Sequence, residues 1–278
     1  MYVSSIIKNF LLLCVTCISQ LFIQSAAACE FESGCQQPIN YLIYGTSAEP
    51  LQIVESDAED GTKIQVSGFI TDVVNEVFAS SGISILPSVK PIARHKVAMI
   101  DGRAKRWIAY ALNSWRKESV WSDATFTDIE LLPYTLSLVF KHVNTLSGNM
   151  QVDVDKLSEQ GVVWIRGFKY PGTLEFSEAY GFEFYRAKNH VAMLSMVEAG
   201  HVQYLMEHAP RIKYVMKKQG VNEEDYDFFS LASYVPPTSL TLLMSNDLGP
   251  DVIAFVNRRL KEMAESDRLN VLARSYGL

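Results

Sequence analysis

The feature that most constrains the fold is a regular alternation of short apolar runs with helical patterns. Residues 39–44 (INYLIY) and 107–112 (WIAYAL) have the length and apolar content of buried strands. Residues 70–78 place apolar side chains at i, i+3, i+4, i+7 and i+8, which predicts a helix with one buried face. A short strand at 83–86 and a helix opened by Pro91 complete the series. Strand, helix, strand, helix, strand in this order predicts a parallel sheet flanked by helices, so the expected fold class is α/β.

The loop after the strand at 107–112 carries an arginine between two tryptophans, Trp115 and Trp121. In open α/β sheets, ligands bind at the carboxyl ends of strands, where this loop lies. The guanidinium of Arg116 is a fixed fork of donors that suits a carboxylate or a phosphate. The alternative is that Arg116 forms a surface ion pair and that Trp115 fills a gap in the core.

Composition limits the classes of protein that need to be considered. The 278 residues are 48% hydrophobic and 20% charged, which is typical of a globular chain with one large or two medium domains. The formal charge is −6 and no block of basic residues occurs, which argues against a nucleic-acid partner. The sequence has no H-x-x-x-H pair, G-x-S-x-G elbow or Walker loop, so we expect neither an enzyme nor a cofactor.

The first 28 residues have the pattern of a secretory signal peptide. Lys8 is the only charge before Glu30, residues 10–23 are largely apolar, and residues 25–28 (SAAA) are small. A membrane anchor is the alternative, but polar residues dilute the apolar run and no basic flank follows it. We therefore expect export to the periplasm.

The mature chain would keep two cysteines, Cys29 and Cys35. In an oxidising compartment we expect them to form a disulfide, and two unpaired thiols are the alternative. Signal cleavage directly before Cys29 with attachment of a lipid is a further alternative. We expect no metal site, because two cysteines without an adjacent histidine do not complete a tetrahedral shell.

The second half of the chain repeats the strand and helix signals. A β-rich run at 131–142 exceeds the length of most single strands and suits a segment that crosses between two lobes. The order helix, glycine, strand at 196–206 echoes the order at 99–112, which suggests two lobes built alike. We expect strands at 162–165, 183–185, 202–206, 229–235 and 239–244, helices near 173, at 189–199, from 250 and around 269–276, and a mixed, charged segment at 209–228.

Four segments resemble one known family. Residues 68–75 (GFITDVVN) resemble its G-F-x-x-D-[LV]-x-x helix start, and Pro91, Arg94 and Gly102 resemble its P-x-x-R…G stretch. Residues 163–171 (VWIRGFKYP) are similar to its V-x-x-x-x-G-x-x-Y segment. The closing part of the chain, 255–260 and Tyr276-Gly277, resembles its last helices. With the two crossings, these segments resemble bacterial extracellular solute-binding protein family 3, a group of type II periplasmic binding proteins.

The resemblance implies a two-lobed α/β fold in which each lobe is a mainly parallel sheet flanked by helices. It implies a signal peptide at 1–28, a lobe 1 made of 29–134 and 239–278, and a lobe 2 at 135–238 with hinges near 131–140 and 231–240. A monomer of this kind captures a small polar or anionic solute, such as an amino acid or organic acid. It delivers the solute to an inner-membrane ABC permease.

The resemblance also assigns roles to particular residues. Arg116, with Trp115 beside it, lies close to the family's arginine that holds the ligand carboxylate, and Tyr44 is the candidate for an aromatic that stacks on the ligand. His208 falls nearest to the family's aspartate for an ammonium group, with Glu207 one residue earlier. Lys169 and Tyr170 precede a helix start, where an anion could meet unpaired amides.

Each of these assignments has a plainer alternative. The aromatic residues could pack in the core, the segment around Tyr170 could be an ordinary turn, and Glu207 and His208 could be surface residues. The sequence departs from the family at Lys105 and Gln203, where the family has the aspartate of its G-x-x-D motif. Two other functions stay open: a sensor module of the same fold without a transport role, and an exported hydrolase.

Overall fold

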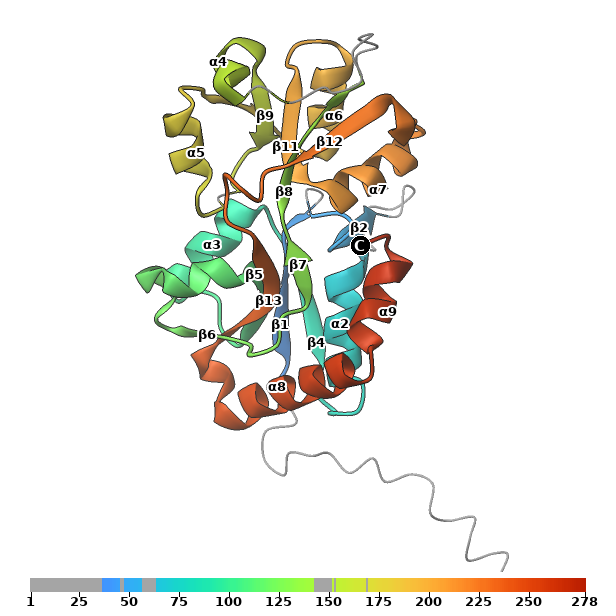
Figure 1. The fold of residues 1–278 in the computed structure, drawn as a ribbon. Coiled ribbons are helices and arrows are strands. Elements are labelled where there is room, and N and C mark those ends of the chain that lie inside the picture. Colours follow the sequence, from blue (N-terminus) through green and yellow to red (C-terminus); the bar gives the residue numbers. More distant parts are fainter. Residues whose placement is uncertain (1–36, 46–47, 57–63, 143–151, 153, 169) are drawn as a thin grey trace, which may run out of the picture.

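The computed structural model describes residues 37–45, 48–56, 64–142, 152, 154–168 and 170–278. The predicted signal peptide, the predicted pair Cys29 and Cys35, and Lys169 lie outside the described residues. Figure 1 shows two α/β bodies, one above the other, each built around its own sheet. We call the body drawn below lobe 1 and the body above it lobe 2.

Lobe 1 contains a six-stranded sheet with the order β4-β1-β5-β13-β6, in which β7 also pairs with β13. Its strands are β1 (Ile39–Ile43), β4 (Ile85–Val89), β5 (Trp107–Leu112), β6 (Ala124–Phe126), β7 (Leu132–Tyr134) and β13 (Thr238–Ser245). A separate hairpin pairs β2 (Ile53–Ser56) with β3 (Ile64–Ser67).

Lobe 2 contains a five-stranded sheet with the order β10-β9-β11-β8-β12. Its strands are β8 (Leu136–Lys141), β9 (Val162–Ile165), β10 (Phe184–Ala187), β11 (Tyr204–His208) and β12 (Tyr226–Ser230). Both sheets are mixed. β1 runs parallel to β4 and β5, and β9 runs parallel to β10 and β11, whereas β13 and β8 join their sheets antiparallel. The two antiparallel strands come directly after the chain crosses between the lobes.

Helices join the parallel strands and cover the sheets (Figure 1). The connecting helices are α2 (Phe69–Phe78), α3 (Ile92–Ile100), α5 (Thr173–Ala179) and α6 (His190–Glu198). The others are α4 (Leu157–Gln160), α7 (Ala209–Gln219), α8 (Pro250–Glu265) and α9 (Arg268–Ser275). Among the helices the structure describes, none has the length and apolar character needed to cross a bilayer.

The start of α2 explains why the sequence has glycine at position 68. Gly68 has a φ of 109°, and a Cβ built there would lie 2.8 Å from the carbonyl oxygens of Pro50 and Leu51. Another residue would therefore strain the backbone and clash. Tyr276, directly after the last helix, holds the start of α2 in place. Its hydroxyl donates to Asp72 at 2.6 Å and accepts from the Gly68 amide at 3.2 Å.

Some elements differ from the prediction. Residues 209–228, for which no helix or strand was predicted, hold α7 and the start of β12, and the strand predicted at 229–235 ends at Ser230. The apolar face of α7 was obscured because one of its buried residues is Arg211, beside Ile212, Val215 and Met216. The run at 131–142 is two strands of different sheets, with only Thr135 between β7 and β8.

Candidate functional site

The two lobes meet where the chain crosses between the sheets. The first crossing is the single residue Thr135, and the second is the segment 231–237, which includes Pro236-Pro237. The carboxyl end of β11 and the start of α7 lie beside the first crossing. Residues at these strand ends are therefore placed between the lobes, where ligands bind in this kind of architecture.

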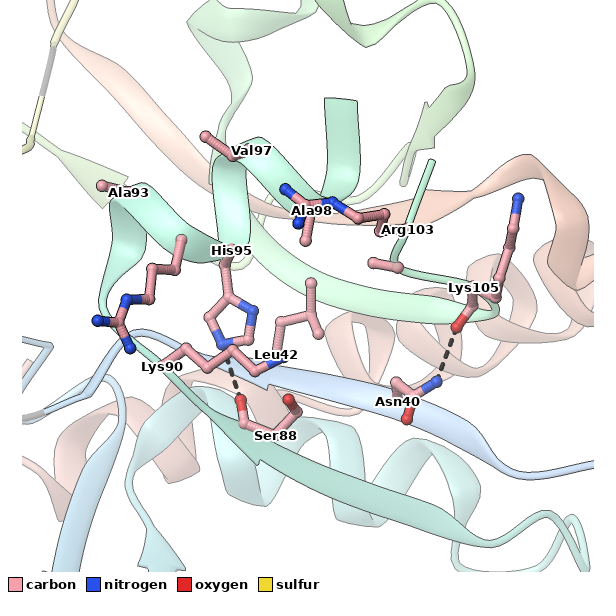
Figure 2. A pocket seen from close by; sticks show the side chains of 12 residues that line it. Asn40, Leu42, Ser88, Lys90, Ala93, His95, Val97, Ala98, Arg103 and Lys105 are labelled. Atoms are coloured by element: carbon pink, nitrogen blue, oxygen red, sulfur yellow. Dashed lines mark hydrogen bonds between the residues drawn. The ribbon is translucent and has the colours of Figure 1, made fainter. Parts of the chain in front are cut away.

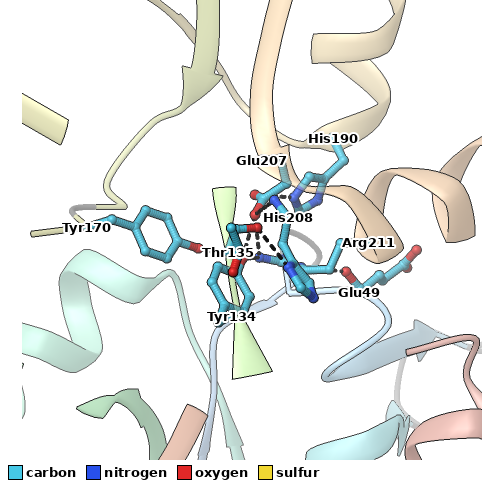
Figure 3. Close-up of polar contacts among 8 residues, drawn as sticks. All are labelled: Glu49, Tyr134, Thr135, Tyr170, His190, Glu207, His208 and Arg211. Carbon is cyan, nitrogen blue, oxygen red and sulfur yellow. Dashed lines mark hydrogen bonds and ion pairs between the residues drawn. The ribbon is translucent and has the colours of Figure 1, made fainter. Parts of the chain in front are cut away.

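A buried network of charged and polar side chains fills the centre of this junction (Figure 3). Glu207, the penultimate residue of β11, lies 3.3 Å from the Nη1 atom of Arg211 on α7. Its other oxygen accepts from His190 Nε2 at 2.8 Å. The hydroxyl of Tyr134, at the end of β7, donates to Glu207 and accepts from Arg211 at 2.9 Å. Glu207 and Arg211 are both 0% exposed.

This network also ties lobe 2 to lobe 1. The Nε atom of Arg211 donates to the backbone carbonyl of Glu49 at 3.1 Å, and Glu49 belongs to the loop after β1. Lys218, on the same helix, places its ammonium 3.0 and 3.1 Å from the Glu49 carboxylate oxygens. Helix α7 therefore carries two cations that both reach one residue of the opposite lobe.

The charges in the network follow from burial and pairing. Burial alone would raise the pKa of Glu207, but Arg211 and the hydrogen bond from His190 outweigh it and hold this pKa well below its usual range. Burial acts to lower the pKa of Arg211, but Glu207 outweighs it and raises that pKa further. Burial, with Arg211 nearby, lowers the pKa of His190. The pair Glu207–Arg211 is therefore ionised, and His190 is a neutral donor.

A column of stacked rings extends from the network to Trp164 of lobe 2. The Tyr134 ring stacks on two others. Its centroid lies 4.3 Å from that of the His208 ring and 5.4 Å from that of the Tyr170 ring. Trp164 stacks on Tyr170 at 5.5 Å. The hydroxyls of Tyr134 and Tyr170 are 2.8 Å apart, and His208 Nδ1 is 3.0 Å from the carbonyl of Thr135. The crossing residue, the network and Trp164 are thus connected by contact.

An interlobe pocket of about 550 Å³ lies at the end of this column, a size typical of small-molecule sites. Lobe 1 contributes Ser114, Lys117 and Glu118, and lobe 2 contributes residues that include Trp164 and Arg186. The buried Trp164 Nε1 and Ser114 Oγ atoms have no hydrogen-bond partner in the part of the chain that the structure describes. The pocket therefore offers both signs of charge.

The structure places Tyr170 and His208 in this junction, where both have partners within the chain, and their roles in binding stay predictions. Tyr44 is buried in lobe 1, where its hydroxyl donates to the carbonyl of Tyr110 at 3.0 Å. Trp115 is half-buried and stacks on Trp121, with the ring centroids 6.1 Å apart. Together Tyr44 and Trp115 line a neighbouring apolar pocket of about 580 Å³, which also reaches Gly167 of lobe 2.

Arg116 lies outside the described pockets, on the exposed side of the 3₁₀ segment Asn113–Lys117. Its Nε atom donates to Asn113 at 3.1 Å, its Nη2 atom donates to the carbonyl of Thr127 at 2.9 Å, and its guanidinium covers Phe126. The next residue, Lys117, lines the interlobe pocket instead. A role for Arg116 in binding stays a prediction.

Sequence reasoning missed Arg211 and His190, and the alternative that Glu207 and His208 are surface residues is wrong, since both are buried. A signal was present, because Glu207 and Arg211 stand four residues apart across a helix start marked by Pro210, at N1 or N2 of α7. Among the described residues, no group of three or more His, Cys, Asp or Glu side chains is placed to hold a metal ion.

These features define a class: a two-lobed α/β protein with a ligand-sized pocket between the lobes. No protein-family model matches the sequence, and a search of curated proteins finds no match either. Solved structures do match. The substrate-binding protein of an amino-acid ABC transporter gives a TM-score of 0.65 at 13% identity, covering 86% of this chain and 99% of that chain.

Two further structures agree. An ABC uptake transporter substrate-binding protein from Streptococcus pneumoniae with bound histidine gives a TM-score of 0.64 at 14% identity, covering 86% of this chain and 92% of that chain. The GluR0 ligand-binding core in complex with L-glutamate gives 0.65 at 13% identity, covering 86% and 98%. The chain therefore has the fold of the type II periplasmic binding proteins, which confirms the predicted fold, and these similar structures are binding proteins, not enzymes.

Proposed function

We propose that this protein is a periplasmic solute-binding protein that holds a small ionised solute, such as an amino acid or organic acid, between its lobes. The observation that carries the proposal is the interlobe pocket lined by Ser114, Lys117, Trp164 and Arg186. Its lining residues come from both lobes, so a solute bound there would contact lobe 1 and lobe 2 together.

The charges of the pocket indicate the kind of solute. Lys117 and Arg186 supply positive charge, and Glu118 and Glu175 supply negative charge. Arg186 lies over the rings of Trp164 and Phe184, at 5.6 and 5.3 Å, so its guanidinium is oriented by stacking. Both signs within one small pocket suit a zwitterion or a hydroxylated acid better than an uncharged sugar.

Delivery of the solute to an ABC permease is the first biological role we propose. A sensor module of the same fold is the second. Genes for a permease and an ATPase next to this one would favour transport. An exported hydrolase is disfavoured, because the described residues lining the pocket include no histidine or cysteine to act with Ser114.

A thermal-shift screen of amino acids, organic acids and small sugars tests the binding proposal. A true ligand at a hundredfold excess over its dissociation constant adds about 2.7 kcal/mol of stability. With the best ligand, calorimetry on Lys117→Met should show a loss of about 1.5–3 kcal/mol, the usual value for a hydrogen bond to a charged group.

Two variants complete the test. Lys217→Met, an exposed lysine on α7, is the matched control and should bind as the unchanged protein does. Arg116→Ala tests the sequence-based prediction that Arg116 contacts the ligand. A large loss of affinity would support that prediction. If the two lysine variants, Lys117→Met and Lys217→Met, bind the ligand equally well, this pocket is not the binding site.

A further inference from the structure

A second concave site lies on the flank of lobe 1, away from the interlobe pocket. Strands β1 and β4, helix α3 and the loop before β5 enclose a groove of about 840 Å³ (Figure 2). All of its lining residues fall between Asn40 and Lys105, so it shares none with the pocket between the lobes. Its apolar lining is Leu42, Ala93, Val97, Ala98 and Ala104.

The groove has a charge opposite to that of the whole chain. It is lined by Lys90, Arg94, Arg103 and Lys105 and by no carboxylate, although the chain carries a formal charge of −6. Arg103 is paired with Asp101 at 2.6 Å. In the described part of the chain, no ion pair or hydrogen bond is found for the side chains of the other three. A concave site lined by one sign of charge raises the local concentration of oppositely charged molecules.

The walls of the groove are fixed by a buried histidine. His95 of α3 is 1% exposed, and its Nε2 atom lies 3.1 Å from the carbonyl of Ile43 in β1 and 2.8 Å from the carbonyl of Ser88 in β4. One ring therefore holds the helix to two adjacent strands. At the other end, the amide of Asn40 donates to the carbonyl of Lys105 at 2.7 Å and holds the loop. Fixed walls favour binding, because little order has to be imposed on the protein.

We propose that this groove is a second binding site, for an elongated organic molecule that carries two or more phosphate, sulfate or carboxylate groups. Figure 2 shows Lys90 and Lys105 at opposite ends of the groove, with Leu42 between them. An anionic group would meet Lys90 at one end, and a second would meet Lys105 at the other, while Arg94 belongs to the same lining. The carbon body would lie on the apolar lining. Arg94 offers the planar fork that suits a phosphate or carboxylate, and the lysines act as point charges.

A soluble molecule fits this site better than a membrane surface. The groove is concave, and its volume falls in the range of small-molecule sites. A chain with net negative charge is also repelled from an anionic bilayer over the distance that salt leaves unscreened. Neither observation depends on what occupies the pocket between the lobes.

Isothermal titration of the mature protein with fructose 1,6-bisphosphate, and with inorganic tripolyphosphate as a second probe, tests the proposal. We expect saturable binding with a dissociation constant below about 1 mM that weakens as salt rises. The triple variant Lys90→Gln/Arg94→Gln/Lys105→Gln should weaken binding at least about tenfold, as expected when charge-assisted hydrogen bonds are lost. A control with the same change of charge, Lys188→Gln/Lys217→Gln/Lys261→Gln, should bind within about twofold of the unchanged protein.

Three outcomes would overturn the proposal: no binding of either probe, equal affinities for the two triple variants, or binding only to anionic phospholipid vesicles. A normal circular-dichroism spectrum and unfolding midpoint of the first triple variant would show that it is folded. Lys117→Met should keep the groove's affinity, so that failure of the interlobe site and failure of the groove can be told apart.

Discussion

The lobe junction and the lobe 1 groove use positive charge in opposite ways. At the junction Arg211 is 0% exposed and faces the carboxylate of Glu207, whereas Lys90, Arg94 and Lys105 are exposed and line a groove without a carboxylate. A buried ion loses its hydration and has to be compensated inside the chain, so Arg211 is committed to the structure. An exposed cation keeps its water and can exchange it for a ligand. The comparison teaches that a buried arginine between two lobes is not by itself a ligand-binding residue.

Removing the carboxylate at the junction should have the largest effect. Glu207→Gln leaves the charge of Arg211 buried without its partner, and breaking a buried pair in this way costs ~3–5 kcal/mol. Urea unfolding measures the change. Glu265→Gln, at an exposed position on α8, is the control and should change the free energy of unfolding by less than about 0.5 kcal/mol. Similar losses for the two variants would show that the junction charges are solvated, and the contrast with the groove would then fail.

Acid should lower the free energy of unfolding by less than Glu207→Gln does, because Glu207 stays ionised until strong acid. Burial lowers the pKa of His190, His208 and His95 below the ordinary value of about 6.5. Between the folded-state and unfolded-state pKa values the unfolded chain binds more protons, so the free energy of unfolding falls as pH drops through about 6.5. It stops falling below the folded-state pKa values.

The urea midpoint measured between about pH 7.5 and pH 5 should record this loss. His190→Gln keeps a neutral side-chain donor and removes one titrating group, so its midpoint should change less with pH. A midpoint that is constant for the unchanged protein would contradict the neutral, buried state of these rings.

The smallest effect is expected at the ion pair on the surface of the junction. The side chains of Lys218 and Glu49 are 44% and 14% exposed, so solvent screens their attraction. Lys218→Ala should cost only ~0.2–1 kcal/mol, and Lys217→Ala, at the next position of the helix, is the control. A loss as large as that of Glu207→Gln would mean that the rim of the junction, and not its buried centre, holds the lobes together.

Much of the fold could be predicted from the sequence. The alternation of apolar strands and amphipathic helices in 39–112 predicts the β-α-β order of lobe 1, since each pattern is local. The strand at 107–112 and the helix at 70–78 agree with β5 and α2 to within a residue. Helix α7 was missed because a residue that is charged in sequence, Arg211, is buried by a partner that only the tertiary structure supplies.

The site was harder to predict than the fold. Arg116 and Lys117 are neighbours in a 3₁₀ segment with about three residues per turn, so their side chains point in directions about 120° apart. A shift of one position in matching a family pattern therefore changes which side chain faces the pocket. The pairing of Glu207 with His190 likewise joins residues from different elements, and no local pattern indicates it.

The single residue between β7 and β8 has one more consequence. Any change in the angle between the lobes has to be taken up at Thr135 and in 231–237, and Tyr134 moves with the end of its strand. Its ring stacks on Tyr170, and Tyr170 stacks on the indole of Trp164. Lobe movement should therefore alter the light emitted by Trp164, and a solute could be titrated by intrinsic fluorescence without attaching a dye.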